Sequence, residues 1–344
     1  MKAMLMKAMI MTRITSLSEN PEPLELADLP RPEPGPGEVL VRVAACGVCH
    51  TELDEIEGRT APPRFPMVLG HEVVGRVEEL GRGVTRLAVG TRVGVGWIHH
   101  STGDERENLS PEFRATGRDV FGGYAEYLTV PEGYAYPIPE TYSDLEAAPL
   151  LCAGAIGYRA LRLTNLQDGQ PLGLTGFGGS AHLVIQLASH LYPRSPVYVF
   201  ARDAQSREFA RRLGAVWSGE TTERSPQRLQ AIIDTTPAWT PVVEALANLL
   251  PGGRLVINAI RKESRDQEVL RKLSYHEHLW MEREIKTVAN IASRDIREFL
   301  PLAAAIPIRP RIQVYPLERA NEALVDLYRG SIQGAKVLRV SEKV

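Results

Sequence analysis

The sequence predicts an α/β protein that joins a doubly wound parallel sheet to a second, β-rich domain. At 344 residues the chain is long enough for two domains. From about residue 155, short apolar strands alternate with helix-like segments, a pattern typical of βαβ units around a buried parallel sheet. Residues 1–150 instead contain short β-branched runs separated by Gly and Pro, which is typical of a β-rich domain.

The individual elements follow from these patterns in chain order. The N-terminal run MKAMLMKAMI is predicted to be a first strand, since neither the apolar core nor the cleavage site of a signal peptide follows it. Further strands are expected at Val39–Ala44, Val73–Val77 and Ala125–Val130. The parallel sheet is expected to contain Leu172–Thr175, Val197–Phe200, Ala231–Asp234 and Leu255–Ile257, with helices at His182–Leu191, Arg207–Leu213 and Val242–Leu250. A helix, Leu317–Tyr328, and a strand, Val337–Val340, are expected near the C-terminus. One domain should comprise residues 1–154 and 292–344, and the other residues 155–291.

Composition and charge narrow the class of protein. The net charge of −2 gives no reason to expect nucleic acid or an anionic membrane as a partner. No apolar stretch approaches the ~20 residues that span a bilayer. The three cysteines, Cys46, Cys49 and Cys152, are too few for a disulfide framework and favour a reducing compartment. We therefore expect a cytoplasmic protein.

A glycine-rich turn follows the first strand of the predicted parallel sheet. Its sequence, TGFGGSA, fits G-x-G-x-x-A and stands between a strand and a helix whose N-terminus supplies an anion site. Gly176 permits the tight turn, Gly178 lets the backbone approach a pyrophosphate, and Ala181 keeps the helix close to the strand. The sequence therefore predicts a Rossmann domain that binds a nicotinamide dinucleotide at Gly176, Gly178, Gly179, Ser180 and Ala181.

The end of the next strand bears on the choice between NAD and NADP. An acidic residue at that position binds the ribose 2′-hydroxyl of NAD, but this strand ends in Phe200, Ala201 and Arg202. Arg202 could bind the 2′-phosphate of NADP bidentately, or it could be a solvent-exposed arginine without a ligand. Asp203 could turn inward and bind NAD instead. On balance the sequence favours NADP(H) over NAD(H).

Two short motifs in the first domain carry candidate metal ligands. Residues 47–51 have the sequence GVCHT and residues 70–72 the sequence GHE. Cys49 offers a thiolate, His71 an imidazole and Glu72 a carboxylate, ligand types that suit Zn²⁺. Three strong protein ligands leave one coordination position of the metal for water or substrate, and Thr51 places a hydroxyl near that position. The residues therefore predict an open, catalytic zinc site.

Taken in order, these motifs resemble those of the zinc-dependent alcohol dehydrogenases of the medium-chain dehydrogenase/reductase family. The resemblance includes LLCAG at residues 150–154, the glycine-rich turn, ANEAL at residues 320–324 and GAKVL at residues 334–338, so it covers essentially the whole chain. It implies a GroES-like catalytic domain in addition to the Rossmann domain. It also implies an oxidoreductase that interconverts alcohols with aldehydes or ketones, and a homo-oligomer (dimer or tetramer).

The resemblance assigns ligand roles to single residues. Cys49, His71 and Cys152 match the three permanent ligands of one catalytic zinc per chain. Glu72 matches a glutamate that can exchange with water on the metal. The zinc would act as a Lewis acid on the substrate oxygen.

The same resemblance implies a path for the proton and the hydride. Thr51 matches the hydroxyl that takes the alcohol proton, and His50 matches a basic residue near the cofactor pyrophosphate. Thr51 would pass the proton outward to Asp54, His50 or water, and the nicotinamide would take a hydride from the substrate carbon.

The sequence also departs from the family pattern. The family usually holds a structural zinc with four cysteines in one loop, but residues 98–122 contain no cysteine, so this closed site cannot be built. We expect packing, or ion pairs such as Asp104 with Arg106, to hold the segment. The aspartate that usually supports the zinc-bound histidine is Glu52, and the histidine often found at the outer end of the proton relay is Asp54.

Two alternatives remain open. A zinc-free quinone or enone reductase on the same fold would use the cofactor alone and would not need the three metal ligands together. A non-enzymatic, cofactor-binding redox sensor would keep the glycine-rich turn and would not need Thr51 beside a metal ligand. Zinc stoichiometry combined with NAD(P)H-coupled turnover separates the three.

Overall fold

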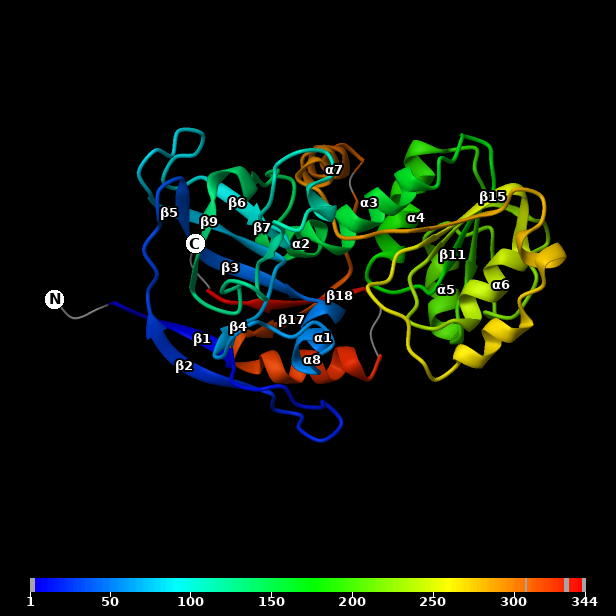
Figure 1. Ribbon diagram of the computed structural model, residues 1–344. Helices are drawn as coiled ribbons and strands as arrows, with labels where there is room; N and C mark the ends of the chain where they lie inside the picture. Colours follow the sequence, from blue (N-terminus) through cyan, green and yellow to red (C-terminus); the bar gives the residue numbers. More distant parts are fainter. Residues whose placement is uncertain (1–3, 307, 331–333, 342–344) are drawn as a thin grey trace. The chain divides into compact units, whose positions relative to one another are not determined.

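The computed structural model describes residues 4–306, 308–330 and 334–341, and the chain divides into two compact units (Figure 1). Unit 1 contains Met1–Ala155 and Asn290–Val344, and unit 2 contains Ile156–Ala289. No helix in the described ranges is long and apolar enough to cross a membrane.

Unit 1 is built on a mixed sheet of seven strands in its described residues. The strand order is β10-β6-β5-β3-β18-β17, and β9 also pairs with β3. These strands are β3 (Glu38–Val48), β5 (Val73–Leu80), β6 (Arg92–Val95), β9 (Tyr127–Pro131), β10 (Ala135–Pro137), β17 (Ile312–Pro316) and β18 (Ala335–Arg339). Two smaller sheets join β2 (Leu24–Pro30), β1 (Leu5–Met11) and β4 (Met67–Val68), and β7 (Ile98–His100) with β8 (Arg114–Ala115). The helices that begin in unit 1 are α1 (His50–Ile56), α2 (Asp144–Ala147), α3 (Ala153–Leu163), α7 (Ser293–Ala305) and α8 (Ala320–Tyr328).

Unit 2 is a doubly wound parallel sheet, as the sequence predicts. Its strand order is β13-β12-β11-β14-β15-β16, which is the Rossmann order 3-2-1-4-5-6 when the strands are counted from β11. The strands are β11 (Leu172–Thr175), β12 (Val197–Phe200), β13 (Trp217–Gly219), β14 (Leu229–Asp234), β15 (Leu249–Ile257) and β16 (Glu284–Thr287). The helices within this unit are α4 (Ala181–Leu191), α5 (Ala204–Arg212) and α6 (Thr240–Asn248).

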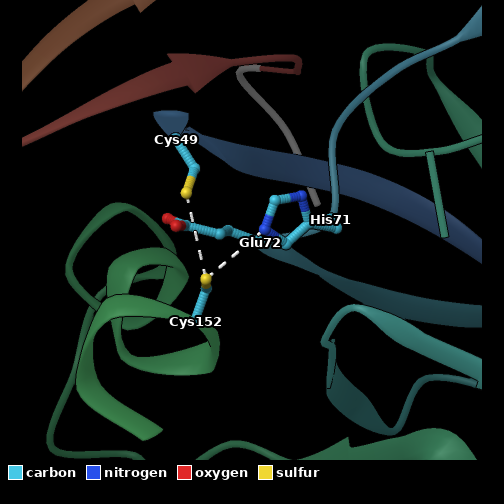
Figure 2. A group of neighbouring side chains, drawn as sticks. All are labelled: Cys49, His71, Glu72 and Cys152. Atoms are coloured by element: carbon cyan, nitrogen blue, oxygen red, sulfur yellow. Dashed lines mark hydrogen bonds between the residues drawn. The ribbon is translucent and has the colours of Figure 1, made fainter. Parts of the chain in front are cut away.

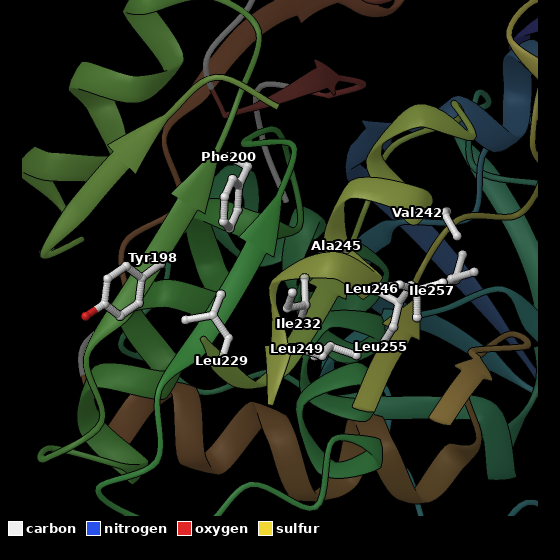
Figure 3. Packing of buried hydrophobic residues seen from close by; sticks show 10 residues of the cluster. All are labelled: Tyr198, Phe200, Leu229, Ile232, Val242, Ala245, Leu246, Leu249, Leu255 and Ile257. Atoms are coloured by element: carbon white, nitrogen blue, oxygen red, sulfur yellow. The ribbon is translucent and has the colours of Figure 1, made fainter. Parts of the chain in front are cut away.

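The apolar side chains of this sheet and of α6 form one buried cluster, seen closely in Figure 3. Leu246 of α6 and Ile232 of β14 are fully buried, and Phe200 of β12 is 1% exposed. At about 25 cal/mol per Å² of apolar surface, such burial stabilises the sheet, in which β11 pairs in parallel with both β12 and β14. The carboxyl ends of β11, β12 and β14 are therefore presented side by side, where a doubly wound sheet binds its ligand.

Several elements differ in extent from the sequence-based expectation. β14 begins at Leu229 rather than Ala231, and β15 begins at Leu249 rather than Leu255. The helix expected over Leu317–Tyr328 starts with a 3₁₀ turn, and α8 itself begins at Ala320. The predicted N-terminal strand forms from Leu5, and residues 1–3 lie outside the described residues.

A buried carboxylate, that of Glu107, holds residues 98–122, the segment that contains no cysteine. Glu107 is 1% exposed, and its Oε2 accepts a hydrogen bond from the Tyr134 hydroxyl (2.9 Å). Its Oε1 accepts from the backbone N–H of Ser293, the first residue of α7, where the helix dipole favours a negative charge. The hydroxyl of Ser101 donates to the backbone carbonyl of Glu107 (2.7 Å). Glu107 therefore ties this segment to two other parts of unit 1.

The ion pair expected between Asp104 and Arg106 is not found among the described residues. Asp104 Oδ1 instead accepts a hydrogen bond from the backbone N–H of Arg106 (2.7 Å), because the two residues share a tight turn. The Arg106 guanidinium is thus not the partner of Asp104, and that part of the expectation is wrong.

Candidate metal centre and cofactor-binding turn

The pairing of β3 with β5 brings the metal-ligand motifs together. Cys46 of β3 lies opposite Val73 of β5, so Cys49, just after β3, lies near the two residues that precede β5, His71 and Glu72. The backbone N–H of Gly47 donates to the carbonyl of Glu72 (2.9 Å). A Cβ at Gly47 would lie 1.8 Å from Glu72 Oε2, so only glycine allows this approach.

Cys152, the residue immediately before α3, completes the group, as Figure 2 shows. Its Sγ lies 4.0 Å from Cys49 Sγ and 3.4 Å from His71 Nε2. One ligand atom from each of Cys49, His71, Glu72 and Cys152 lies within 4.8 Å of the others. Zinc bond lengths of about 2.0–2.3 Å imply ligand separations of roughly 3.3–3.8 Å in a tetrahedron, so these residues fit a zinc ion after small shifts.

The charges at this site favour a cation. Contact with Cys152 and with His71 lowers the pKa of Cys49 well below that of an ordinary thiol, against the effect of burial. The contact with Cys49 and burial raise the pKa of Cys152 well above it. Burial and the negative charge of Cys49 raise the pKa of Glu72. A divalent cation stabilises the anionic form of each of these three groups.

Glu52 supports His71 from the opposite side of the imidazole ring. Its Oε1 lies 2.6 Å from His71 Nδ1, and its Oε2 accepts a hydrogen bond from the backbone N–H of Cys49 (2.7 Å). A carboxylate on Nδ1 fixes the ring and leaves Nε2, which faces Cys152, as the ligand atom. Burial lowers the pKa of His71, but Glu52 and Cys49 together raise it well above its usual value. The glutamate thus occupies the place that the family pattern gives to an aspartate.

The three candidate proton carriers have different surroundings. Thr51 is 7% exposed, and its hydroxyl lies 3.6 Å from Cys49 Sγ, next to the metal site. His50, the first residue of α1, is exposed. Asp54 is 1% exposed, and its Oδ1 accepts a hydrogen bond from Arg59 Nε (2.6 Å). Asp54 therefore anchors the end of α1, while His50 is open to solvent.

A third buried carboxyl group on α1, after those of Glu52 and Asp54, is not predicted from the sequence. Glu55 is fully buried, and both of its carboxyl oxygens lack a hydrogen-bond partner in the described part of the chain. Burial and the neighbouring charge of Glu52 raise its pKa well above the usual value. The spacing of Glu52 and Glu55, three residues apart in a helix, was the available signal, since it puts both on one helical face.

The predicted cofactor residues form the expected turn in unit 2. Gly176, which follows β11, has φ of +77°, a conformation that favours glycine. A Cβ on Gly178 would meet no atom within 4 Å, so the backbone is open to a ligand there. Gly179, Ser180 and Ala181 lead into α4, the helix that supplies the anion site.

The three residues that bear on the choice between NAD and NADP, Ala201, Arg202 and Asp203, directly follow β12. Ala201 is 3% exposed, and Arg202 is exposed. Asp203 is the N-cap of α5, because its Oδ1 accepts a hydrogen bond from the backbone N–H of Ser206 (2.7 Å). Arg207 Nη1 donates to the carbonyls of both Ala201 and Arg202 (2.8 Å each), which fixes the backbone at the end of the strand.

Comparison with known proteins gives consistent results. Residues 35–140 match the model of the alcohol dehydrogenase GroES-like domain. A probable alcohol dehydrogenase, AdhA, of Mycobacterium tuberculosis is 42% identical over 329 residues, which are 92% of this chain and 93% of that protein. An alcohol dehydrogenase of Geobacillus stearothermophilus is 31% identical over 93% of this chain and 97% of its own length. A solved NAD-dependent alcohol dehydrogenase superposes with a TM-score of 0.84 at 26% identity, covering 97% of this chain and 100% of that one.

Proposed function

This chain belongs to the alcohol dehydrogenases of the medium-chain dehydrogenase/reductase family and is an NAD(P)-dependent enzyme, and we propose that it uses one zinc ion per chain and prefers NADP(H). In this proposal it interconverts alcohols with aldehydes or ketones. The observation that carries the zinc assignment is the approach of four ligand atoms, from Cys49, His71, Glu72 and Cys152, to within 4.8 Å of one another. A zinc-free reductase would have no use for this arrangement, and the relatives named above are alcohol dehydrogenases rather than sensors.

Each residue of the site has a separate task in this proposal. Cys49, His71 and Cys152 would hold the zinc, which when bound supplies a Lewis acid for the substrate oxygen. Glu52 holds the His71 ring in the orientation that binding requires. Thr51 takes the alcohol proton and passes it toward solvent, with exposed His50 as its outlet, because the carboxylate of Asp54 is bound to Arg59.

Removal of the Thr51 hydroxyl is expected to slow turnover without loss of metal or cofactor. A well-placed proton carrier contributes about 10²–10⁴-fold to the rate, so Thr51→Ala should lower kcat by that range. Thr51→Ser keeps the hydroxyl and should be close to neutral. Steady-state kinetics with parallel zinc analysis test this. Wild-type turnover in both Thr51→Ala and Thr51→Val would rule out the hydroxyl as the proton carrier.

The preference for NADP(H) is supported by the residues after β12. Ala201 provides no carboxylate for the 2′-hydroxyl of NAD. The carboxylate of Asp203, the residue that could have rescued NAD binding, already serves as the N-cap of α5. Arg202 is exposed beside it and offers a cation to a 2′-phosphate.

We therefore expect NADP(H) to be preferred about 10- to 150-fold, since a hydrogen bond to a charged group contributes about 1.5–3 kcal/mol. Arg202→Ala should raise the KM for NADPH with little change for NADH, and Ala201→Asp should reverse the preference. Initial rates with both cofactors measure this. A wild-type enzyme that uses NADH as well as NADPH would show that Arg202 does not contact the cofactor.

The proposed activity itself is tested by turnover on a panel of substrates. Primary, secondary, benzylic and cyclic alcohols and their carbonyl products are assayed with both cofactors, and zinc is measured in the same preparation. Zinc-dependent turnover supports the proposal. Turnover on quinones or enones that persists after removal of the metal would favour the zinc-free alternative.

Two features bear on the assembly and location that we propose. Apolar side chains are exposed along one stretch of unit 2 that leads into β16, the edge strand of its sheet: Leu273, Tyr275, Leu279, Trp280, Met281 and Ile285. A surface of this kind is typical of an interface, which supports a homo-oligomer and is tested by the mass in solution.

A reducing, cytoplasmic location would keep Cys49 and Cys152 as separate thiols, as ligand binding requires.

A further inference from the structure

We propose that Asp234, held by Lys262, is a positioning residue for the cofactor: it joins the carboxyl ends of β11 and β14 and thereby fixes the glycine-rich turn. This inference rests on the proposed binding of NADP(H) at that turn. In a doubly wound sheet the ligand binds outside the carboxyl ends of the strands, where the strand order reverses. Here the order reverses between β11 and β14, whose last residues, Thr175 and Asp234, lie opposite each other.

The Asp234 carboxylate binds the strand that leads into the turn. Asp234 is fully buried, and its Oδ1 accepts a hydrogen bond from the hydroxyl of Thr175 (2.5 Å). The same oxygen accepts from the hydroxyl (2.8 Å) and the backbone N–H (3.2 Å) of Thr236. Thr175 immediately precedes Gly176, so the position of this carboxylate sets where the turn begins.

Lys262 neutralises this buried carboxylate and is fully engaged. Its Nζ forms an ion pair with Asp234 Oδ2 and donates to the carbonyls of Thr236 (2.7 Å) and Ala238 (3.2 Å). An ammonium group has three N–H donors, and these three acceptors use all of them. A lysine at this edge of the sheet could be expected to bind a cofactor phosphate, but Lys262 has no donor left to do so.

The C-terminal end of the glycine-rich turn is also connected to Asp234, through Asn258. The backbone N–H of Asn258, the residue after β15, donates to the carbonyl of Asp234 (2.7 Å). Its side-chain Nδ2 donates to Ser180 Oγ, at the end of the glycine-rich turn (3.4 Å). A Cβ on Gly176 would lie 2.9 Å from Thr235 Oγ1, so the residues after Asp234 also pack directly on the turn. Movement of Asp234 would therefore displace both ends of the cofactor-binding turn.

The test measures NADPH binding to the intact protein without substrate, by cofactor fluorescence, together with the thermal midpoint. Thr175→Val removes the hydroxyl that binds Asp234 but keeps the buried ion pair. It is expected to raise the dissociation constant of NADPH about fivefold or more, the usual size of a coupling between a site and a neighbouring contact. Thr175→Ser should restore wild-type affinity. Thr164→Val is the matched control, because Thr164 is also a buried threonine of unit 2, whose hydroxyl donates to a backbone carbonyl (2.6 Å) away from the turn.

The control is expected to lower the midpoint and leave NADPH affinity unchanged. A Thr175→Val protein that behaves in the same way would make the contact merely structural and overturn the proposal. Lys262→Met leaves the Asp234 carboxylate without its counter-charge and is expected to lower both the thermal midpoint and the NADPH affinity; an unchanged affinity would also overturn the proposal. Gly178→Val, whose Cβ would meet no atom of the protein within 4 Å, should abolish NADPH binding. If it does not, the cofactor does not bind at this turn, a failure of the underlying site assignment that is distinct from the Thr175 results.

Discussion

Replacement of Cys49 by Ser is expected to remove the zinc and to lower turnover by at least about 10³-fold, while NADPH still binds. Serine offers a poor zinc ligand in place of a thiolate whose pKa the site holds well below the usual value. Lewis-acid activation is worth several kcal/mol, and each 1.36 kcal/mol is a factor of ten in rate. NADPH binding is expected to survive because the cofactor-binding turn belongs to unit 2, whereas all the metal ligands belong to unit 1.

Elemental analysis and initial rates on the same preparation check this expectation, and Cys46→Ser is its matched control. Cys46 is also a cysteine of this part of the chain and is fully buried in β3, but it is not among the clustered ligand atoms. Its replacement should leave the zinc content unchanged. A Cys49→Ser protein that keeps a full equivalent of zinc and wild-type turnover would refute the ligand assignment.

Truncation of Glu107 is expected to destabilise unit 1 by about 2–6 kcal/mol, because two buried donors lose their acceptor and each unsatisfied donor costs about 1–3 kcal/mol. Glu107→Ala leaves the Tyr134 hydroxyl and the Ser293 N–H without their acceptor. Glu107→Gln keeps the shape and one acceptor oxygen, so it should have an intermediate effect. Denaturant unfolding at neutral pH, monitored in parallel with zinc content, measures the difference in free energy of unfolding.

The control for this prediction lies two residues away. Glu105 forms an ion pair with Arg294 of α7, as Glu107 binds α7, but its side chain is 82% exposed. Exposed ion pairs contribute about 0–1 kcal/mol, so Glu105→Ala should be nearly neutral. Equal effects of Glu105→Ala and Glu107→Ala would show that the buried carboxylate does not hold this segment.

The sequence was informative where chemistry and conformation act locally. β11 and β12 have the predicted bounds, because short apolar runs lie between turn residues, and Gly176 adopts the positive φ that its place in the motif requires. The ligand motifs were recognisable because Cys49, His71 and Glu72 are chemically distinctive; in the structure Cys49 directly follows β3, and His71 and Glu72 directly precede β5.

What the sequence did not reveal depends on side-chain contacts, most of them between residues far apart in the chain. Glu107 resembles any surface glutamate of a polar loop until Tyr134 and Ser293 are seen to enclose it. Arg59 binds the carboxylate of Asp54, and for this reason we propose His50 as the outlet for the proton. The spacing of residues along a helix does not predict this contact. Lys262 and Asp234 are likewise 28 residues apart, and only the order of the strands brings them together.

The most direct test of the zinc assignment is a titration of chelator-treated protein with Zn²⁺, with NADPH-coupled turnover as the readout. Binding by Cys49, His71 and Cys152 predicts no activity before zinc is added and a linear recovery that ends at one equivalent per chain. Full activity in the metal-free protein, or recovery that continues to two equivalents, would contradict a single catalytic zinc at this site.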